Sequence, residues 1–255
     1  MTAKETEKKA QNNAKNKIVI MGTTSKQVMD IKTSKGLSQT SNEELRAWTD
    51  KGWEQAMREG NYDRSREHLN FEVQKGGIVT PIDKKRPLTK RMAENLASRG
   101  IKDPNEGLAE PRFRTVVNFI FGGSTDRMRE LAFGNQEVDF ESKGGNGHVR
   151  RMPEIEEWAR DIYRFVADKY GEENIISFIV HRDEKNPHVH CALLPIDQNG
   201  KFAFKQIFHG QNRLGFKNYM LTLHDELAKV NEKWGLTRGV SVVESGAKHR
   251  STEEY

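Results

Sequence analysis

The chain has 255 residues, of which 31% are charged and 35% are hydrophobic, and its formal net charge is +5. This composition is typical of a rather polar globular protein with one good core or two small ones. The single cysteine, Cys191, excludes a disulfide framework and favours a reducing cytoplasm, and no apolar run approaches the ~20 residues that span a bilayer.

The first 17 residues are rich in lysine and contain no aromatic residue, valine, isoleucine or leucine. We expect a disordered basic segment over residues 1–17 and a single domain over residues 18–255. The apolar stretch after this segment is too short for a secretory signal peptide and is predicted to be a strand over residues 18–21. Residues 22–40 are polar and give no clear prediction.

Five helices are predicted from capping signals and helical spacing. Ser41 and Glu44 form a capping-box pattern that predicts a helix over residues 41–59, ended by Gly60. Shorter helices are expected over residues 89–99 and from Thr125. The two longest, over residues 153–170 and 216–234, have apolar residues three and four apart and end at Gly171 and Gly235.

Residues 68–73 alternate between polar and apolar side chains, which predicts a strand. Its apolar face would cover the core, and its other face would carry His68, Asn70 and Glu72. Such a face suits either a functional site or a plain exposed edge strand. A second strand is predicted over residues 114–121, and residues 143–147 are expected to be a flexible glycine loop.

Three of the eight histidines fall within the ten-residue run HRDEKNPHVH, which begins at His181 and ends at His190. Apolar flanks on both sides, and Pro187 within the run, predict two antiparallel strands joined by a short connection. Side chains alternate along a strand, so His188 and His190 share a face that His181 can reach from the neighbouring strand. A single strand histidine is usually structural, but three converging imidazoles suit Mn, Co, Ni or Zn at a catalytic site with open positions.

The run from His181 to His190, with Asp183, Glu184 and Pro187 between the histidines, resembles the metal-binding motif of the Mob/Pre plasmid mobilisation relaxases. These enzymes belong to the histidine–hydrophobe–histidine endonuclease superfamily. The segment around Asn70 and the C-terminal glycines and Ala-Lys-His run are also similar to this family, although Phe71 stands where the family has a tyrosine. The similarity covers roughly residues 61–73 and 153–250.

The resemblance implies an α+β fold, with a central antiparallel sheet of about five strands covered by helices. It implies metal binding by His181, His188 and His190, with manganese favoured over Mg, Zn, Co or Ni. Glu184 would be a base or an orienting group, and Asp183, Asn70 and Glu72 would support the ligands. A bacterial cytoplasmic location and accessory mobilisation or coupling proteins as partners are also implied.

Relaxases nick one strand of a transfer origin by transesterification and become attached to the 5′ phosphate. The family's histidine or tyrosine nucleophile has no counterpart at the corresponding N-terminal position. Among the remaining residues, Tyr62 and His68 are the candidates that lie near the predicted polar strand, so both stay open.

Residues 201–217 contain basic residues and phenylalanines but no acid. This mixture is typical of a groove for unpaired nucleic acid, although core phenylalanines under a solvated surface would give the same pattern. We predict DNA contacts by six basic residues: Arg64, Arg66, Lys201, Lys205, Arg213 and Lys217. Two other functions remain open, namely a metal-dependent hydrolase that activates water through Glu184 and a non-catalytic single-stranded DNA-binding module.

Overall fold

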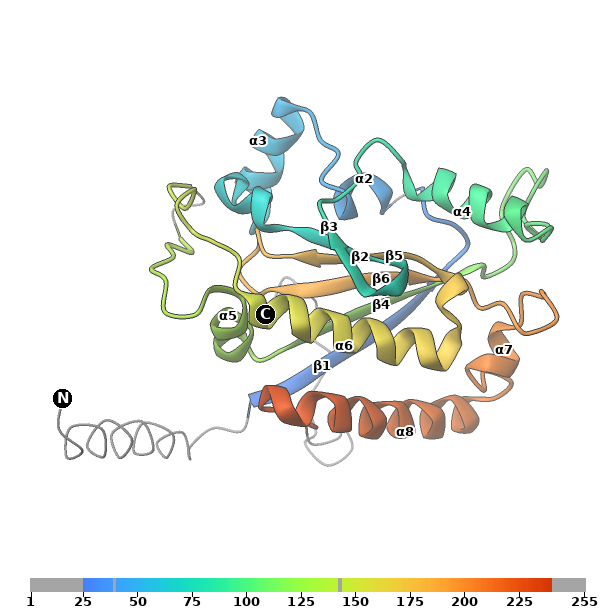
Figure 1. The fold of residues 1–255 in the computed structure, drawn as a ribbon. Coiled ribbons are helices and arrows are strands. Elements are labelled where there is room, and N and C mark those ends of the chain that lie inside the picture. The colour runs from blue at the N-terminus through green and yellow to red at the C-terminus, as the bar shows by residue number, and fades with distance from the viewer. Residues whose placement is uncertain (1–24, 39, 142–143, 240–255) are drawn as a thin grey trace.

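A single sheet lies at the centre of the part of the chain that the structure, a computed structural model, describes: residues 25–38, 40–141 and 144–239 (Figure 1). It contains seven strands in the order β3-β2-β5-β6-β4-β1-β7. The strands are β1 (Ser25–Ser34), β2 (Phe71–Gln74), β3 (Ile78–Thr80), β4 (Val116–Gly123), β5 (Ile175–His181), β6 (His188–Leu193) and β7 (Leu236–Thr237). Every neighbouring pair is antiparallel except β1 and β7.

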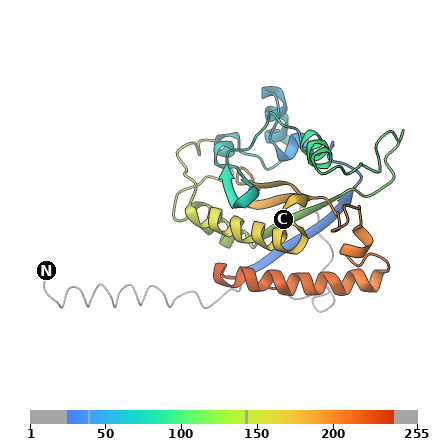
Figure 2. The ribbon, with the colours of Figure 1, turned by 45° about the vertical axis from the view of Figure 1, so that its right-hand side comes forward.

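Helices cover both faces of this sheet, with α6 and α8 on one side and α2 and α4 on the other (Figures 1 and 2). The α-helices are α2 (Ser41–Glu44), α3 (Asp50–Glu59), α4 (Leu88–Ser98), α5 (Thr125–Phe133), α6 (Pro153–Tyr170), α7 (Phe204–Ile207) and α8 (Arg213–Asn231). Short 3₁₀ helices are η1 (Arg64–Leu69), η2 (Lys75–Gly77), η3 (Glu172–Asn174) and η4 (Glu232–Trp234). The predicted α+β class is therefore confirmed. Within the described residues, no helix combines the length and apolar character that a membrane crossing requires.

The alternation of side chains in β5 and β6 divides the core into two layers. Phe178 and Val180 of β5 join the larger cluster under α6 and α8, while Ile179 points to the smaller cluster under α4. Ala192 of β6 lies in that smaller cluster too. Because His190 is two residues from Ala192 and pairs with Ile179, the histidines face the α2 and α4 side of the sheet.

The two long helices follow the sequence prediction closely. The bounds of α6 are those predicted, and α8 begins three residues early and continues through η4 to Trp234. Gly171 and Gly235 end these segments with positive φ angles of 86° and 68°, which side chains with a Cβ rarely adopt.

Two predicted elements are wrong. The helix over residues 41–59 is broken into α2 and α3, and Ser41 does not cap it, since its hydroxyl accepts a hydrogen bond from the backbone N–H of Leu88. The strand over residues 68–73 begins only at Phe71, because His68 and Leu69 belong to η1.

The count of about five strands is also too low. The ten-residue strand β1 escaped prediction because its sequence, SKQVMDIKTS, is largely polar, and only Met29 among its hydrophobic residues is buried. β3 and β7 are too short to leave a pattern. The predictions for residues 1–17 and for a strand over 18–21 lie outside the described residues, as does part of the predicted loop over 143–147.

Leu227→Ala should lower the free energy of unfolding by about 2–5 kcal/mol, because Leu227 on α8 is fully buried against the sheet. Leu221 lies on the same helix but is 36% exposed, so Leu221→Ala should change it by less than about 0.5 kcal/mol. Urea denaturation of both variants checks this. Equal losses would show that α8 does not pack as described.

Candidate active site

The three histidines of the HRDEKNPHVH run meet where β5 ends and β6 begins. His181 pairs directly with His188 across the two strands, and His190 is on the same face. Their ring centroids are 4.8–5.6 Å apart, and one nitrogen from each ring lies within 4.8 Å of the others. The predicted convergence of the three imidazoles is thus confirmed; their role as metal ligands stays a prediction.

Backbone carbonyls fix which ring nitrogens carry hydrogen. His181 Nε2 lies 2.8 Å from the carbonyl oxygen of Glu44, and His188 Nδ1 lies 2.8 Å from that of Asn186. A carbonyl oxygen can only accept, so each of these nitrogens must donate its N–H. His181 Nδ1 and His188 Nε2 are therefore the nitrogens that carry lone pairs. His188 Nε2 accepts a hydrogen bond from His190 Nε2 at 2.8 Å, and the buried His181 Nδ1 has no hydrogen-bond partner within the described residues.

The protein environment favours the neutral form of His181 and of His190. Burial, the Arg46 guanidinium and His188 lower the pKa of His181 far below its ordinary value. Burial and the two other histidines have the same effect on the pKa of His190. Three imidazoles whose ring nitrogens converge, with His181 and His188 oriented by carbonyls on the far side of each ring, are the donor set that a borderline divalent cation requires.

Glu184 adds a carboxylate to this cluster. Its Oε1 atom lies 3.7 Å from His181 Nδ1 and 3.8 Å from His188 Nε2. The same oxygen accepts a hydrogen bond of 2.5 Å from Arg46. Glu184 can therefore supply a fourth ligand while Arg46 holds it in place.

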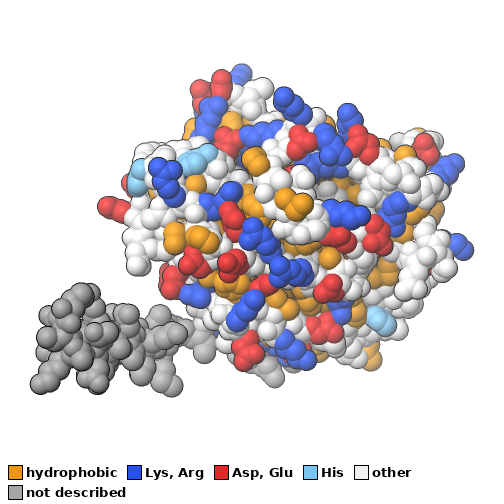
Figure 3. Space-filling model, viewed as in Figure 1, with side chains coloured by type: hydrophobic (Ala, Val, Ile, Leu, Met, Phe, Trp, Pro, Cys, Tyr) orange, Lys and Arg blue, Asp and Glu red, His pale blue; other side chains and the backbone are white. Residues whose placement is uncertain are grey.

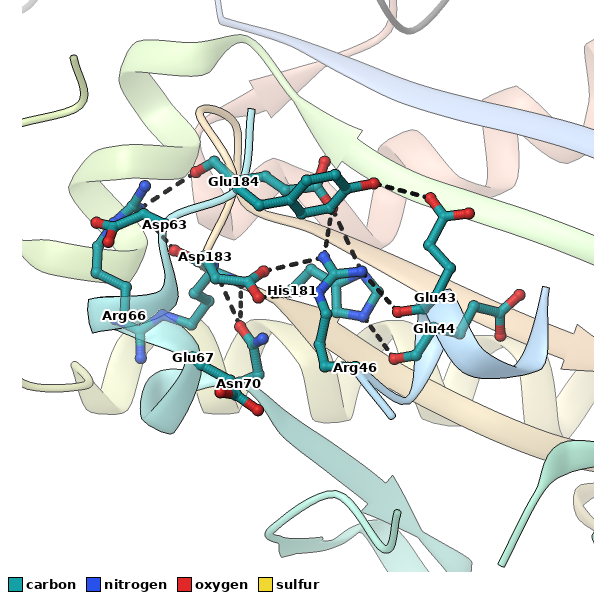
Figure 4. Close-up of polar contacts among 12 residues, drawn as sticks. Glu43, Glu44, Arg46, Asp63, Arg66, Glu67, Asn70, His181, Asp183 and Glu184 are labelled. Atoms are coloured by element: carbon teal, nitrogen blue, oxygen red, sulfur yellow. Dashed lines mark hydrogen bonds and ion pairs between the residues drawn. The ribbon is translucent and has the colours of Figure 1, made fainter. Parts of the chain in front are cut away.

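Arg46 joins the segment between α2 and α3 to the histidine loop (Figure 4). Its Nε and Nη2 atoms donate to the two carboxylate oxygens of Asp183 at 2.8 and 3.0 Å, and both side chains are completely buried. Burial alone would raise the pKa of the Asp183 carboxyl, but the Arg46 guanidinium and the hydrogen bond with Asn70 together lower it. The positive φ of 52° at Arg46 ends α2 and turns the side chain inward, which is unusual for a residue other than glycine.

Two further side chains hold the backbone that follows His181. Asn70 Oδ1 accepts the backbone N–H groups of Arg182 and Asp183, at 2.6 and 3.2 Å. Arg66 donates to the carbonyl oxygens of Arg182 and Glu184, at 2.6 and 3.2 Å. Asn70 thus holds the backbone next to His181, and its predicted role in supporting metal ligands stays a prediction.

Tyr62 is the nucleophile candidate whose contacts connect it to the histidine cluster. Its hydroxyl donates to Glu43 Oε1 at 2.9 Å, and its ring lies 4.7 Å from the Arg46 guanidinium carbon. Burial and the nearby carboxylates of Glu184 and Glu43 raise the pKa of Tyr62. The hydroxyl is therefore neutral in the resting site and next to a carboxylate that can accept its proton.

His68 and Glu72 lie elsewhere. His68 is exposed, and its ring nitrogen contacts the carbonyl oxygen of Val149 at 3.3 Å rather than any group of the cluster. Glu72 is buried in an ion pair with Arg91 of α4. The single polar face predicted for His68, Asn70 and Glu72 was wrong because η1 replaces the first part of the strand.

Of the basic residues predicted to contact DNA, one is buried and five are exposed. Arg66 is buried in an ion pair with Asp63, so the structure places it inside the protein rather than on a DNA-binding surface. Arg64 is exposed and forms an ion pair with Asp50. The other four residues are exposed as well: Lys201, Lys205, Arg213 and Lys217. Positive and negative side chains are interspersed over the face formed by α6 and α8, so that face has no dominant sign (Figure 3).

Sequence reasoning missed Arg46 and Glu43, because both were assigned to the interior of one long helix. A signal for the break was present. Thr49 is a favourable N-cap residue, and in the structure its hydroxyl accepts the backbone N–H of Gly52 at 3.2 Å at the start of α3. A second helix start soon after the first capping signal leaves a loop around Arg46.

Residues 148–255 match the family model described as Plasmid recombination enzyme, Mob_Pre. The histidine cluster lies within this range, so the resemblance seen in the sequence is confirmed there. Plasmid recombination enzyme type 1 of Staphylococcus aureus is 33% identical over 104 residues, which are 40% of this chain and 24% of that relative. A plasmid recombination enzyme of Lactiplantibacillus plantarum is 46% identical over 46 residues, 18% of this chain and 13% of that relative. The chain thus matches only a minor part of these relatives' length.

The fold is similar to solved structures of the MobM relaxase domain. In one, Mn-bound and holding plasmid pMV158 oriT DNA, the TM-score is 0.59 at 20% identity, covering 89% of this chain and 95% of that one. In another, with 26-nucleotide pMV158 oriT DNA, the TM-score is 0.52 at 16% identity, covering 90% and 99%. This likeness shows that the chain shares the fold of that domain.

Arg46→Ala should lower the free energy of unfolding by about 3–5 kcal/mol, because it leaves the buried Asp183 carboxylate without its partner. Arg64→Ala, which removes an exposed ion pair, should cost less than about 1 kcal/mol. Urea denaturation of the two variants compares them. A similar small loss in both would contradict the central position of Arg46.

Proposed function

We propose that this chain is the relaxase domain of a Mob/Pre plasmid recombination enzyme, which nicks one strand of a transfer origin and remains attached to the 5′ phosphate. The observation that carries the proposal is the group of three converging histidines with Glu184 beside them. The family match over residues 148–255 and the relaxase fold support it.

His181, His188 and His190 would hold a divalent cation, with Glu184 as a fourth ligand. Manganese is the first candidate, because the similar MobM relaxase domain is Mn-bound. When bound, the cation would act as a Lewis acid that polarises a non-bridging oxygen of the scissile phosphate. The unpartnered His181 Nδ1, which is buried at the centre of the cluster, fits this use.

Tyr62 is our candidate for the nucleophile. Its oxygen would form a bond to phosphorus as the bond from phosphorus to the 3′ oxygen breaks, and its proton would pass to Glu43, whose carboxylate is 2.9 Å away. The departing 3′ oxygen would take a proton from water and become a hydroxyl. Glu43 is the nearer base, and Glu184 would hold the cation rather than accept the tyrosine proton.

Manganese binding tests the metal proposal by titration calorimetry. His188→Asn should weaken binding by roughly 100-fold or more, since loss of a supporting group alone typically costs 10- to 100-fold. His148→Asn is the matched control, because His148 is exposed and its ring nitrogens lie beside the backbone carbonyls of Gly145 and Glu137. Unchanged binding in His188→Asn would remove the metal site from the proposal.

The nucleophile is tested with an origin oligonucleotide from the replicon that encodes the chain, incubated with Mn²⁺ and run on a denaturing gel. The wild-type protein should give a covalent species of lower mobility, and Tyr62→Phe should reduce it by about three orders of magnitude or more. His68→Gln should leave it unchanged. An adduct that survives in Tyr62→Phe would exclude this tyrosine.

The same gel separates the other two functions. Cleaved strand without a covalent species would indicate a hydrolase that activates water, with Glu184 as the base. Salt-dependent binding without cleavage would indicate a non-catalytic DNA-binding module.

A further inference from the structure

A basic pocket of about 800 Å³ lies at the end of the sheet opposite the histidines. Its lining residues come from the segment after α4, the residues before β4 and the segment around α7. From His190 to Ile196, which pairs with Phe202 at the pocket, the chain advances six residues. At ~3.3 Å per residue this is about 20 Å, so the basic pocket is separate from the candidate active site.

The charges of the basic pocket are all of one sign. Its walls carry five exposed cations and no carboxylate: Lys102, Arg112, Arg114, Lys201 and Lys205. None of these cationic groups forms a salt bridge or a side-chain hydrogen bond within the described residues, whereas Arg86, for comparison, is paired with Glu94. The neighbouring Asp197 carboxylate accepts the backbone N–H groups of Asn199 and Lys201. Unneutralised cations gathered in a concave site attract a polyanion.

Aromatic rings stand among these charges. Phe113 is 53% exposed, which is unusual for a residue of its size, and it lines the basic pocket together with Phe202 and Phe204. The Arg114 guanidinium lies 5.9 Å from the centre of the Phe204 ring. Open ring faces next to cations are the surfaces on which unpaired bases stack, and bases in a duplex have no free face to offer.

The loop that carries Phe113 is held in place before any ligand arrives. The Asn105 side-chain oxygen accepts the backbone N–H groups of Arg112 and Phe113, each at 2.9 Å. Its amide nitrogen donates to the carbonyl oxygens of Phe113 and Lys35, at 2.8 and 3.1 Å. An exposed phenylalanine fixed by such a set of bonds is preorganised for binding, which lowers the entropic cost of ordering the loop.

We propose that the basic pocket binds an unpaired stretch of the DNA strand, about 20 Å away from the scissile phosphate. This inference rests on the proposed function for the identity of the strand. Phosphates would contact the five cations, and a base would stack on Phe113. The strand would then be held at two separated points, which would keep the segment between them aligned for nicking.

The test is fluorescence anisotropy with a labelled oligothymidine, in EDTA so that the histidines contribute nothing through a metal. Oligothymidine forms no hairpin and requires no origin sequence. Phe113→Ala should weaken binding roughly tenfold because the stacking surface is removed. Arg112→Ala/Lys205→Ala should weaken it to a similar degree and should reduce the salt slope by about 0.7 for each phosphate that is no longer neutralised.

The matched control is Lys75→Ala/Lys229→Ala, which removes two exposed cations that lie outside the basic pocket. It should bind as the wild type does. Wild-type affinity in both pocket variants, equal weakening in the control, or no binding by the wild-type protein at low salt would overturn the inference. Nicking is measured separately, so the two proposals can fail independently. If the wild-type protein does not nick, but Phe113→Ala still weakens oligothymidine binding, the proposed function is refuted and the inference about the basic pocket is supported.

Discussion

The buried ion pair between Arg46 and Asp183 is the interaction on which the rest of the site depends. It joins residues 137 positions apart in the chain, and both side chains are inaccessible to solvent. Two ions are costly to bury, and their attraction offsets that cost only when the geometry is good and the remaining hydrogen-bonding groups are satisfied. Here the contact is bidentate, and the other guanidinium nitrogen donates to the carbonyl oxygen of Glu43 at 2.7 Å.

This pair fixes both halves of the candidate active site at once. On one side it holds the end of α2, from which Glu44 offers its carbonyl oxygen to His181 and Glu43 offers its carboxylate to Tyr62. On the other side it holds the loop that follows β5, where Glu184 approaches the histidines. The same guanidinium lowers the pKa of His181 and lies against the ring of Tyr62. One cation thus links the candidate ligands to the candidate nucleophile.

The parts of this arrangement that could be predicted from the sequence are those set by local periodicity. The alternation around His188 and His190 and the turn at Pro187 predicted a shared face, and the apolar spacing predicted α6 and α8. Arg46 could not be found in this way, because its position depends on its own positive φ angle and on a partner, Asp183, that is distant in sequence. His68 was misplaced for a related reason. An alternating pattern of six residues fits a strand, but Asp63 caps η1 instead: its carboxylate accepts the backbone N–H of Ser65 at 2.9 Å.

The proposed site requires that the three histidines and Glu184 meet at one divalent cation. The most direct measurement is anomalous X-ray scattering from crystals of the protein grown with Mn²⁺. We predict a single strong peak within bonding distance of His181 Nδ1, His188 Nε2 and a ring nitrogen of His190. The absence of anomalous signal at the three histidines at saturating manganese, or imidazole rings turned away from one another, would contradict the proposed metal site.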